Sequence, residues 1–257
     1  MQTAYDPAPA AALLADAWRH GKQLRELPAD CRPATLQQGY DLQDSLFAAM
    51  GGPLAGWKLG VGSPAAMRAG GLDRPLVGRL LQSRCWRDGE TVQLSNGAPV
   101  TVEFEIAWVL GRDIAPGQAP DDPMEAVAGV HTAFELVLSR FVDRRAVGWP
   151  SFAGDSVGFD AFVLGQAIKP TDIDRVIETV RVEVDGVEHA RGLAGDDLSY
   201  PSVALRYLFD HARERGVTLR RGEIVSAGTV AKPFDVAARG VTLTARYHGG
   251  ELRAHLQ

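Results

Sequence analysis

Three glutamates in apolar segments are the residues of this 257-residue chain whose types and spacing most suggest chemistry. Glu103 and Glu105 lie two residues apart in VEFEIAWVL (102–110), so an extended strand would place them on one face, about 7 Å apart. Glu135 lies in AFELVLS, a second apolar segment. A buried carboxylate is costly unless a base, hydrogen bonds or a metal offsets its charge. The three side chains are therefore predicted either to pair with bases or to share one cation.

These two alternatives require different partners. For any one glutamate a structural salt bridge is the simpler explanation, and Arg112 and Arg140 are available bases. Three such acids with few bases nearby favour a shared divalent cation. Mg²⁺ and Mn²⁺ prefer hard oxygen ligands and keep positions open for water and a substrate. We therefore expect Glu103, Glu105 and Glu135 to bind Mg²⁺ or Mn²⁺.

Lys58 lies among apolar residues in GWKLGVGS (56–63), a segment typical of a glycine-flanked strand. A structural salt bridge to one of the glutamates would explain a lysine in this setting. The pattern G-x-G-x-x-A at Gly60, Gly62 and Ala65 lacks the strand–helix–strand unit of a dinucleotide site. We expect no nucleotide cofactor, and we interpret the glycines as allowing close backbone approach around a site.

The remaining pattern predicts a short helical lead and a strand-rich body. Helices are expected over residues 8–27, 35–50 and 200–216, and a short helix is expected after a capping pattern at Asp122, Pro123 and Glu125. Strands are expected over residues 56–63, 88–94, 102–110 and 132–138, with hairpins turning at Asp185-Gly186 and Gly249-Gly250. This order predicts an α+β fold, with a helical lead over 1–52 and a metal-dependent catalytic domain over 53–257.

Composition narrows the class of protein. The chain is 46% apolar and 23% charged, with a net charge of −5 and a pI near 5.7, as in soluble globular proteins. Acids and bases are interspersed, so no basic stripe indicates nucleic-acid binding. Cys31 and Cys85 have no metal-ligand spacing, and neither a signal-peptide pattern nor an apolar run of membrane-spanning length occurs. We expect a cytoplasmic protein with no nucleic-acid or membrane partner.

Six segments, taken in order, resemble the fumarylacetoacetate hydrolase superfamily, and most of all its 2-oxopent-4-enoate hydratase and 4-oxalocrotonate decarboxylase branch. They are GWKLGVGSP, GLDRPLVGRL, VEFEIAWVLGRDI, AFELVLSRF, GDSVGFDAFVLG and GEIVSAG, from about residue 56 to 230. The resemblance implies a mixed, rolled β-sheet like that of the fumarylacetoacetase C-terminal domain, with helices packed outside. It also implies a homo-oligomer, in some cases complexed with a pathway enzyme.

The resemblance also implies roles for single residues. The three glutamates would bind a divalent cation, usually Mg²⁺. Lys58 would supply positive charge or a proton near the substrate oxygens, with the salt bridge to a glutamate as its alternative. Asp155 could position water or relay a proton, with turn capping as its alternative, and Asp73 is a nearby acid that a solvated loop would also explain. The parts of the family pattern that choose among reactions are altered at Leu76, Ser156, Ser199 and Ala227.

The implied reaction is hydration of a 2-hydroxy-2,4-dienoate to a 4-hydroxy-2-oxo acid in aromatic-compound catabolism. A 2-oxo acid can chelate a cation through its carboxylate and keto oxygens, and the cation then stabilises the enolate. The same chelate would serve decarboxylation of a 2-oxo-3-enedioate of the 4-oxalocrotonate type, or hydrolysis of a carbon–carbon bond in an acylpyruvate. A catalytically weak partner subunit is a further alternative.

Overall fold

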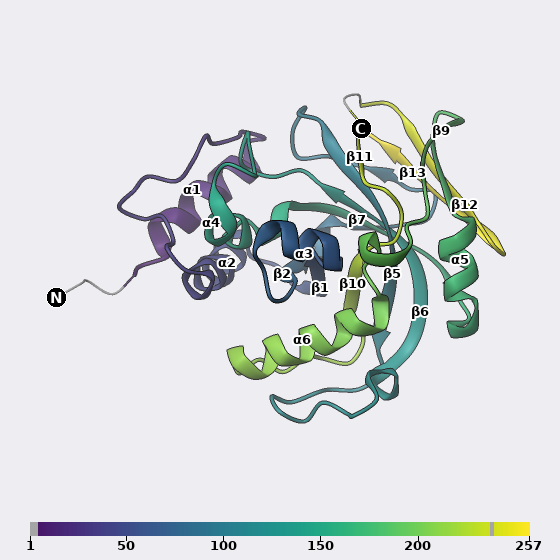
Figure 1. The fold of residues 1–257 in the computed structure, drawn as a ribbon. Coiled ribbons are helices and arrows are strands. Elements are labelled where there is room, and N and C mark those ends of the chain that lie inside the picture. Colours follow the sequence, from purple (N-terminus) through teal and green to yellow (C-terminus); the bar gives the residue numbers. More distant parts are fainter. Residues whose placement is uncertain (1–4, 237–238) are drawn as a thin grey trace.

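Two β-sheets with helices around them form the fold of the computed structural model, which describes residues 5–236 and 239–257 (Figure 1). The larger, eight-stranded sheet contains, in spatial order, β2 (Leu76–Leu81), β1 (Leu54–Gly60), β10 (Ile224–Thr229), β5 (Val100–Leu110), β6 (Val127–Val137), β7 (Phe159–Ile168) and β3 (Cys85–Arg87), with β11 (Phe234–Val236) beside β5. The smaller, five-stranded sheet contains β4 (Thr91–Val92), β13 (Gly250–Leu256), β12 (Thr242–Tyr247), β8 (Arg181–Val184) and β9 (Val187–Arg191).

Helices lie outside the sheets. The α-helices are α1 (Ala8–Arg19), α2 (Leu36–Met50), α3 (Pro64–Gly70), α4 (Gly148–Gly154), α5 (Ile173–Thr179) and α6 (Pro201–Arg215). Short 3₁₀ turns are η1 (Gln82–Arg84), η2 (Pro123–Ala126), η3 (Ser156–Gly158), η4 (Pro170–Asp172) and η5 (Gly195–Asp197). Figure 1 shows α1, α2 and α4 grouped at the N-terminal end of the molecule, with α6 along another side.

The larger sheet is mixed, and the expected α+β fold is confirmed. Strand β1 runs parallel to β10, whereas β5 runs antiparallel to both β10 and β6. Strand β5 is buried on both faces, which explains why apolar residues occupy both sides of its second half. Helices α1 and α2 contribute Leu14, Trp18 and Leu42 to an apolar cluster that also contains sheet residues such as Ala107 and Phe162. The division of the chain after residue 52 stays a prediction.

Several sequence-predicted elements form where we expect them. Helices α2 and α6 match their predicted ranges, and α6 ends at Gly216, whose φ of 65° is the left-handed conformation typical of a helix end. The hairpin of β8 and β9 turns at Asp185 and Gly186, both with positive φ, as a type I′ turn requires.

Other boundaries differ from expectation for local reasons. Helix α1 ends at Arg19 and not at residue 27, because Gly21 adopts a φ of 62° and the Lys22 N–H donates to Ala17, closing the helix. The capping pattern at Asp122 does form, but it starts only the 3₁₀ turn η2, and β6 begins directly afterwards.

Two strand predictions also need correction. The predicted strand over 88–94 is reduced to β4, two residues that pair with the end of β13. In the C-terminal hairpin Tyr247 pairs with Gly250, so the turn lies at His248 and Gly249, one residue earlier than predicted.

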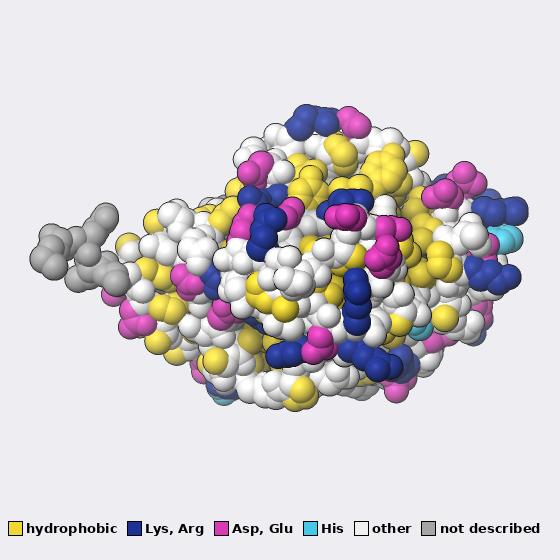
Figure 2. Space-filling model, turned by 90° about the horizontal axis from the view of Figure 1, so that it is seen from below, with side chains coloured by type: hydrophobic (Ala, Val, Ile, Leu, Met, Phe, Trp, Pro, Cys, Tyr) yellow, Lys and Arg dark blue, Asp and Glu magenta, His cyan; other side chains and the backbone are white. Residues whose placement is uncertain are grey.

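The surface carries charges of both signs. Figure 2 shows one face on which acidic and basic side chains alternate among apolar ones, so neither sign forms a continuous stripe there. Within the described part of the chain, no helix is both long enough and apolar enough to cross a membrane.

Candidate metal and substrate site

The ladder between β5 and β6 brings the three glutamates together. Glu103 lies directly opposite Glu135, and Glu105 follows two residues later on the same face of β5. One carboxylate oxygen from each residue lies within 4.8 Å of the others. Glu105 and Glu135 are 0% exposed and Glu103 is half-buried. The structure thus assembles the predicted cluster.

The sheet must curl to bring Lys58 to this cluster. Lys58 lies on β1, which is separated from β6 by β10 and β5. Across a flat sheet three strand spacings amount to roughly 14 Å, more than a lysine side chain spans. Nevertheless the Lys58 Nζ lies 2.8 Å from the Glu135 Oε1, and it also donates to the Val157 carbonyl at 3.3 Å. The salt bridge that we considered as the alternative for Lys58 is therefore present at the site itself.

Glycines make room for the Lys58 side chain. Gly78 faces Lys58 across the β1–β2 ladder. A Cβ on Gly78 would lie 2.8 Å both from the Lys58 Cδ and from the Ser156 carbonyl oxygen, too close for any side chain. A Cβ on Gly60 would lie 3.2 Å from the Lys58 Nζ. Gly60 fits our interpretation of the motif glycines as sites of close approach, and Gly78 is a further such site outside that motif.

Glu105 is held from the side opposite Glu135. The Ser226 hydroxyl donates to the Glu105 Oε2, and the Gly228 N–H donates to the same atom at 3.0 Å. Gly228 has a φ of 92°, which favours glycine. Sequence reasoning missed Ser226 and Gly228. The available signal was a serine inside the otherwise apolar strand segment IVSAG.

Burial and mutual repulsion shift the pKa values of the buried acids. Burial raises the pKa of Glu105 well above its ordinary value, and Glu135 and Glu103 raise it further. Burial raises the pKa of Glu135 to about 7, although Lys58 opposes that shift. Burial alone would lower the pKa of Lys58, but the three glutamates outweigh it, so the pKa is raised and the side chain stays an ammonium.

The donor set fits a divalent cation. In the part of the chain that the structure describes, the three acids form an ion pair with one base, Lys58, which leaves surplus negative charge. The Glu105 Oε1 and Glu135 Oε2 are both buried and accept no hydrogen bond from any described residue. Unpartnered carboxylate oxygens that converge in this way are the hard ligands that Mg²⁺ and Mn²⁺ prefer.

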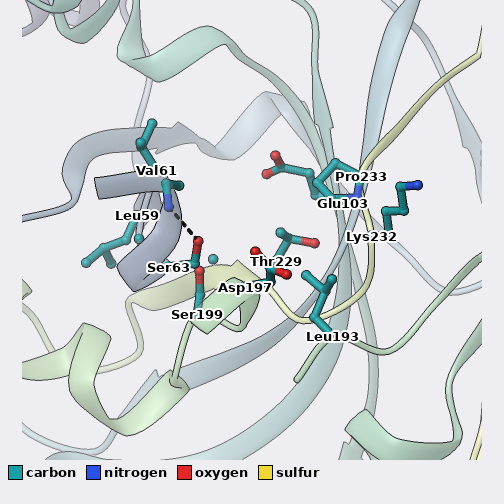
Figure 3. A pocket seen from close by; sticks show the side chains of 14 residues that line it. Leu59, Val61, Ser63, Glu103, Leu193, Asp197, Ser199, Thr229, Lys232 and Pro233 are labelled. Atoms are coloured by element: carbon teal, nitrogen blue, oxygen red, sulfur yellow. Dashed lines mark hydrogen bonds between the residues drawn. The ribbon is translucent and has the colours of Figure 1, made fainter. Parts of the chain in front are cut away.

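Glu103 lines two cavities. The larger, of about 670 Å³, is lined by hydroxyls and aliphatic groups, including Ser63, Ser199, Thr229, Leu59, Val61 and Leu193. Figure 3 shows the Glu103 carboxylate pointing toward the side of this cavity where Val61 lies. The smaller cavity, of about 160 Å³, shares Gly60, Val61 and Glu103 with the larger one, and its wall includes Lys58, Arg144 and Arg145. A molecule bound at Glu103 can therefore extend in two directions.

Asp155 lies in a different environment from the one we expected. Its Oδ2 accepts from the Ser139 hydroxyl at 2.7 Å and from the Arg140 backbone N–H at 3.1 Å, and its Oδ1 accepts from the Arg140 side chain. Asp155 is fully buried and lines neither cavity. Its catalytic role stays a prediction that these contacts disfavour. Arg140 was our candidate partner for a glutamate, but it pairs with Asp155, and Arg112 forms no ion pair within the described residues.

Asp73 and two of the altered positions also lie away from the cavity walls. The Asp73 side chain is 84% exposed, 3.6 Å from the Arg74 guanidinium. Leu76 is buried against Phe152 and Val157. The Ser156 hydroxyl accepts from the Arg79 N–H at 2.8 Å and donates to the Arg79 carbonyl at 3.1 Å. Neither Leu76 nor Ser156 places a polar side-chain group in either cavity.

The other two altered positions lie close to the site. Ser199 lines the larger cavity, and its side chain touches the space beside Gly228. Ala227 lines an adjoining apolar hollow of about 180 Å³ together with Met67 and Tyr207.

Comparisons with known proteins show which family the chain resembles. A family model described as fumarylacetoacetate (FAA) hydrolase C-terminal matches residues 67–257. The chain is 32% identical over 250 residues to a 2-keto-4-pentenoate hydratase of Burkholderia vietnamiensis (strain G4 / LMG 22486), covering 95% of each chain. It is 32% identical over 253 residues to a protein of the same name from Paraburkholderia phymatum, again over 95% of each chain.

A solved structure shares the fold over almost the whole chain. The 4-oxalocrotonate decarboxylase from Pseudomonas putida G7, complexed with magnesium and adipate, superposes with a TM-score of 0.86 at 23% identity, covering 97% of this chain and 96% of that one. Together with the family model and the two hydratases, this likeness leads to one conclusion. The chain belongs to the fumarylacetoacetate hydrolase family.

Proposed function

We propose that the protein is a divalent-metal-dependent lyase that hydrates a 2-hydroxy-2,4-dienoate to a 4-hydroxy-2-oxo acid, in aromatic-compound catabolism. The observation that carries the proposal is the buried acid cluster, whose Glu105 and Glu135 each keep an unpartnered oxygen beside the Lys58 ammonium. The names of the similar proteins support the choice of reaction, because the two at 32% identity are both called 2-keto-4-pentenoate hydratase.

The residues of the site would have three roles: binding the metal, orienting a metal ligand and stabilising charge on the substrate. Glu103, Glu105 and Glu135 would hold Mg²⁺ or Mn²⁺, which when bound supplies Lewis-acid polarisation of the substrate's keto and carboxylate oxygens. Ser226 fixes the orientation of Glu105 through its hydrogen bond. Lys58 offers a fixed positive charge and a hydrogen-bond donor where negative charge develops on a substrate oxygen.

The cavity wall suits the addition of water. With 2-hydroxypenta-2,4-dienoate, one water supplies a proton to C5 and a hydroxyl to C4, and the proton of the C2 enol is replaced by one at C3, which gives 4-hydroxy-2-oxopentanoate. Ser199 and Thr229 place hydroxyls on the wall of the larger cavity, where an added water would bind. The aliphatic residues Leu59, Val61 and Leu193 would contact the hydrocarbon part of the substrate.

The experiment follows the ultraviolet absorbance of the dienol. Purified protein with Mg²⁺ is mixed with 2-hydroxypenta-2,4-dienoate, with and without a chelator, and the products are identified by NMR. We expect loss of the dienol absorbance and formation of 4-hydroxy-2-oxopentanoate only when free metal is present. Hydration that proceeds unchanged with chelator, or no reaction despite bound Mg²⁺, would contradict the proposal.

Decarboxylation is the second candidate, and a specific observation favours it. Leu76 is packed in an apolar cluster and the Ser156 hydroxyl is bonded to the Arg79 backbone, so neither can handle water. Loss of CO₂ from a 2-oxo-3-enedioate needs no added water. Supplying 2-oxohex-3-enedioate distinguishes the two reactions, because CO₂ release from it, with no hydration of the dienoate, would replace the hydratase by a decarboxylase.

The assembly and the ion are part of the proposal. We infer from the family resemblance that the chain acts as a homo-oligomer on a small-molecule substrate, and that Mg²⁺ or Mn²⁺ is the working metal. Light scattering coupled to size exclusion tests the first point, with a monomer mass as the contradicting result. Activity restored to metal-free protein by each ion in turn tests the second.

A further inference from the structure

Two arginines with no acidic partner line the smaller cavity beside Glu103. Arg144 is half-buried and Arg145 is exposed, and both contribute to the wall that also contains Lys58. Across residues 5–236 and 239–257, neither guanidinium lies within ion-pairing distance of a carboxylate. A half-buried guanidinium that faces a cavity without a counter-charge is a ready binding site for an anion.

Arg144 is held in place by a relay of hydrogen bonds. Its Nη2 donates to the Thr101 Oγ1 at 3.0 Å, and the Thr101 hydroxyl donates in turn to Asp235. Thr101 on β5 lies directly opposite Asp235 on β11, so the two strands fix this pair. Thr101 is itself buried. The guanidinium is therefore anchored at one nitrogen, and the others are left for a ligand.

The spacing along β5 separates the Arg144 anchor from the metal cluster. Thr101, Glu103 and Glu105 lie on the same face of β5, at successive steps of about 7 Å. The residue that anchors Arg144 therefore lies about one such step from Glu103, so an anion at Arg144 would bind apart from the carboxylate that the glutamates would hold. A monocarboxylate bound at the cluster would leave this place empty.

The two cavities differ in charge. The larger one carries Asp197 in addition to Glu103, and Figure 3 shows its Lys232 directed away from Glu103. The smaller one carries three bases, Arg144, Arg145 and Lys58, against the shared Glu103. A negatively charged substituent is therefore favoured on the Arg144 side and disfavoured on the other.

We propose that Arg144, assisted by Arg145, binds a second carboxylate of the substrate. The preferred substrate class is then a dicarboxylic 2-oxo acid or its dienol, of about six or seven carbons, long enough for its carboxyl groups to reach two places about 7 Å apart. This inference rests on the proposed function, because it assumes that the first carboxylate and the keto group lie at the glutamates. It applies equally to hydration and to decarboxylation.

Binding of unreactive ligands tests the inference separately from turnover. Calorimetry in saturating Mg²⁺ compares 2-oxoadipate with 2-oxohexanoate, which has the same length but lacks the second carboxylate and, like 2-oxoadipate, the reactive double bonds. We expect the parent protein to bind the dicarboxylate tighter by on the order of 10- to 100-fold. Arg144→Gln should abolish this preference and leave the affinity for 2-oxohexanoate unchanged.

Control variants distinguish a loss of carboxylate binding from a loss of folding. Arg144→Lys keeps the charge and should keep part of the preference, whereas Thr101→Val removes the anchor and should lower it. Arg181→Gln, an exposed arginine on β8, should leave both affinities unchanged. Thermal melting of each variant checks that it is folded.

Each contrary result has a distinct meaning. Equal affinity of the parent protein for both ligands would overturn the inference and leave the proposed function intact. So would an Arg144→Gln variant that loses affinity for both ligands equally, since Arg144 would then bind the first carboxylate. If Mg²⁺ binds but neither 2-oxo acid does, the proposed function itself fails.

Discussion

Two groups of buried charges in this molecule differ in how completely their polar atoms are satisfied. In the first, Arg140 and Asp155 are both 0% exposed, and the Asp155 carboxylate accepts from Ser139 and from the backbone and side chain of Arg140. The other guanidinium nitrogens of Arg140 donate to the carbonyls of Phe159 and Asp155. One acid meets one base, and each finds further partners.

The second group, Glu103, Glu105, Glu135 and Lys58, is unbalanced, because its acids outnumber its base. Among residues 5–236 and 239–257, Lys58 is the single base that forms an ion pair with the glutamate cluster, and Glu105 and Glu135 keep buried oxygens without a hydrogen bond. Burial raises the pKa of Glu105, Glu135 and Asp155, but among these three only Asp155 has its carboxylate enclosed by donors. Satisfied charges of this kind hold a fold together, whereas surplus buried charge indicates a ligand that completes the group.

The largest expected effect comes from removing one acid of the unbalanced group. Glu105→Gln should weaken Mg²⁺ binding by at least about 100-fold and reduce metal-dependent turnover to background, because a carboxylate ligand is lost. The metal-free variant should be at least as stable as the parent, since a repelling buried charge is gone. Calorimetry, turnover and urea unfolding measure the three quantities.

A matched control is Glu178→Gln, which changes an exposed glutamate on α5. It should leave metal binding, turnover and stability as in the parent. If Glu105→Gln binds Mg²⁺ as tightly as the parent, the cluster is not the metal site, and the contrast between the two groups loses its meaning.

Removing the acid of the first group, Arg140 and Asp155, should instead destabilise the protein. Asp155→Ala should lower the free energy of unfolding by about 3–5 kcal/mol, because it leaves the buried Arg140 guanidinium without its carboxylate partner. The double variant Asp155→Leu with Arg140→Met should recover much of that loss, since no charge is left unpaired. Urea unfolding measures both. A stable Asp155→Ala protein that has lost turnover but still binds Mg²⁺ would return Asp155 to the catalytic residues.

The parts of the site and the fold that depend on neighbouring residues could be predicted from the sequence. The E-x-E spacing in an apolar strand predicts a shared face for Glu103 and Glu105, and strand alternation alone supplies that geometry. The apolar setting of Glu135 indicated the third acid, and the family resemblance supplied the role of Lys58. The α+β fold and the hairpin at Asp185-Gly186 were likewise predictable, because each depends on neighbouring residues.

What could not be foreseen depends on contacts between distant segments. Ser226 reaches Glu105 from 121 residues away, and nothing in either segment indicates their pairing. Arg140 was an equally reasonable partner for Glu135 until the turn after α4 placed Asp155 against it. A role for Arg144 could not be predicted, because it depends on Thr101, which only the fold places beside it. The end of α1 depends on the left-handed Gly21, which the alanine-rich pattern obscures.

Lys58 links the unbalanced group to the substrate, and its loss should have a smaller effect than loss of a metal ligand. Lys58→Met should lower kcat by about 10²-fold while Mg²⁺ binding survives, the scale of a positioned charge. Lys58→Arg should not restore activity, because Lys58 is 1% exposed and its stem packs tightly against Gly78, so a larger guanidinium does not fit in place of the ammonium. Steady-state kinetics with calorimetry checks both variants. Turnover within a few-fold of the parent would make the Lys58–Glu135 pair structural.

His211 offers a third way of burying an ionisable group, by keeping it neutral. It packs on α6 against Tyr40 and Trp57, and burial, together with Arg215 and Arg79, lowers its pKa from 6.5 to about 4. Because the unfolded chain binds the proton more readily, stability is lost as the pH falls from about 6.5 toward 4.

The expected loss is about 2 kcal/mol between pH 7 and pH 5. Urea unfolding at the two pH values measures it. The difference between the parent and His211→Gln should isolate this contribution, since glutamine does not titrate. Parallel stability curves for the two proteins would show that His211 is not the group responsible.

The smallest effect is expected at Asp73, which belongs to neither buried group. Its side chain is 84% exposed and lies 3.6 Å from the Arg74 guanidinium, an arrangement in which charge is well screened by water. Asp73→Asn should therefore leave kcat/KM within about two-fold of the parent and the stability within about 0.5 kcal/mol. The same kinetic assay decides the point with Arg74→Gln as its neighbour control. A loss of ten-fold or more at Asp73 alone would mean that this loop closes over the bound substrate, and that an exposed acid completes the site during turnover.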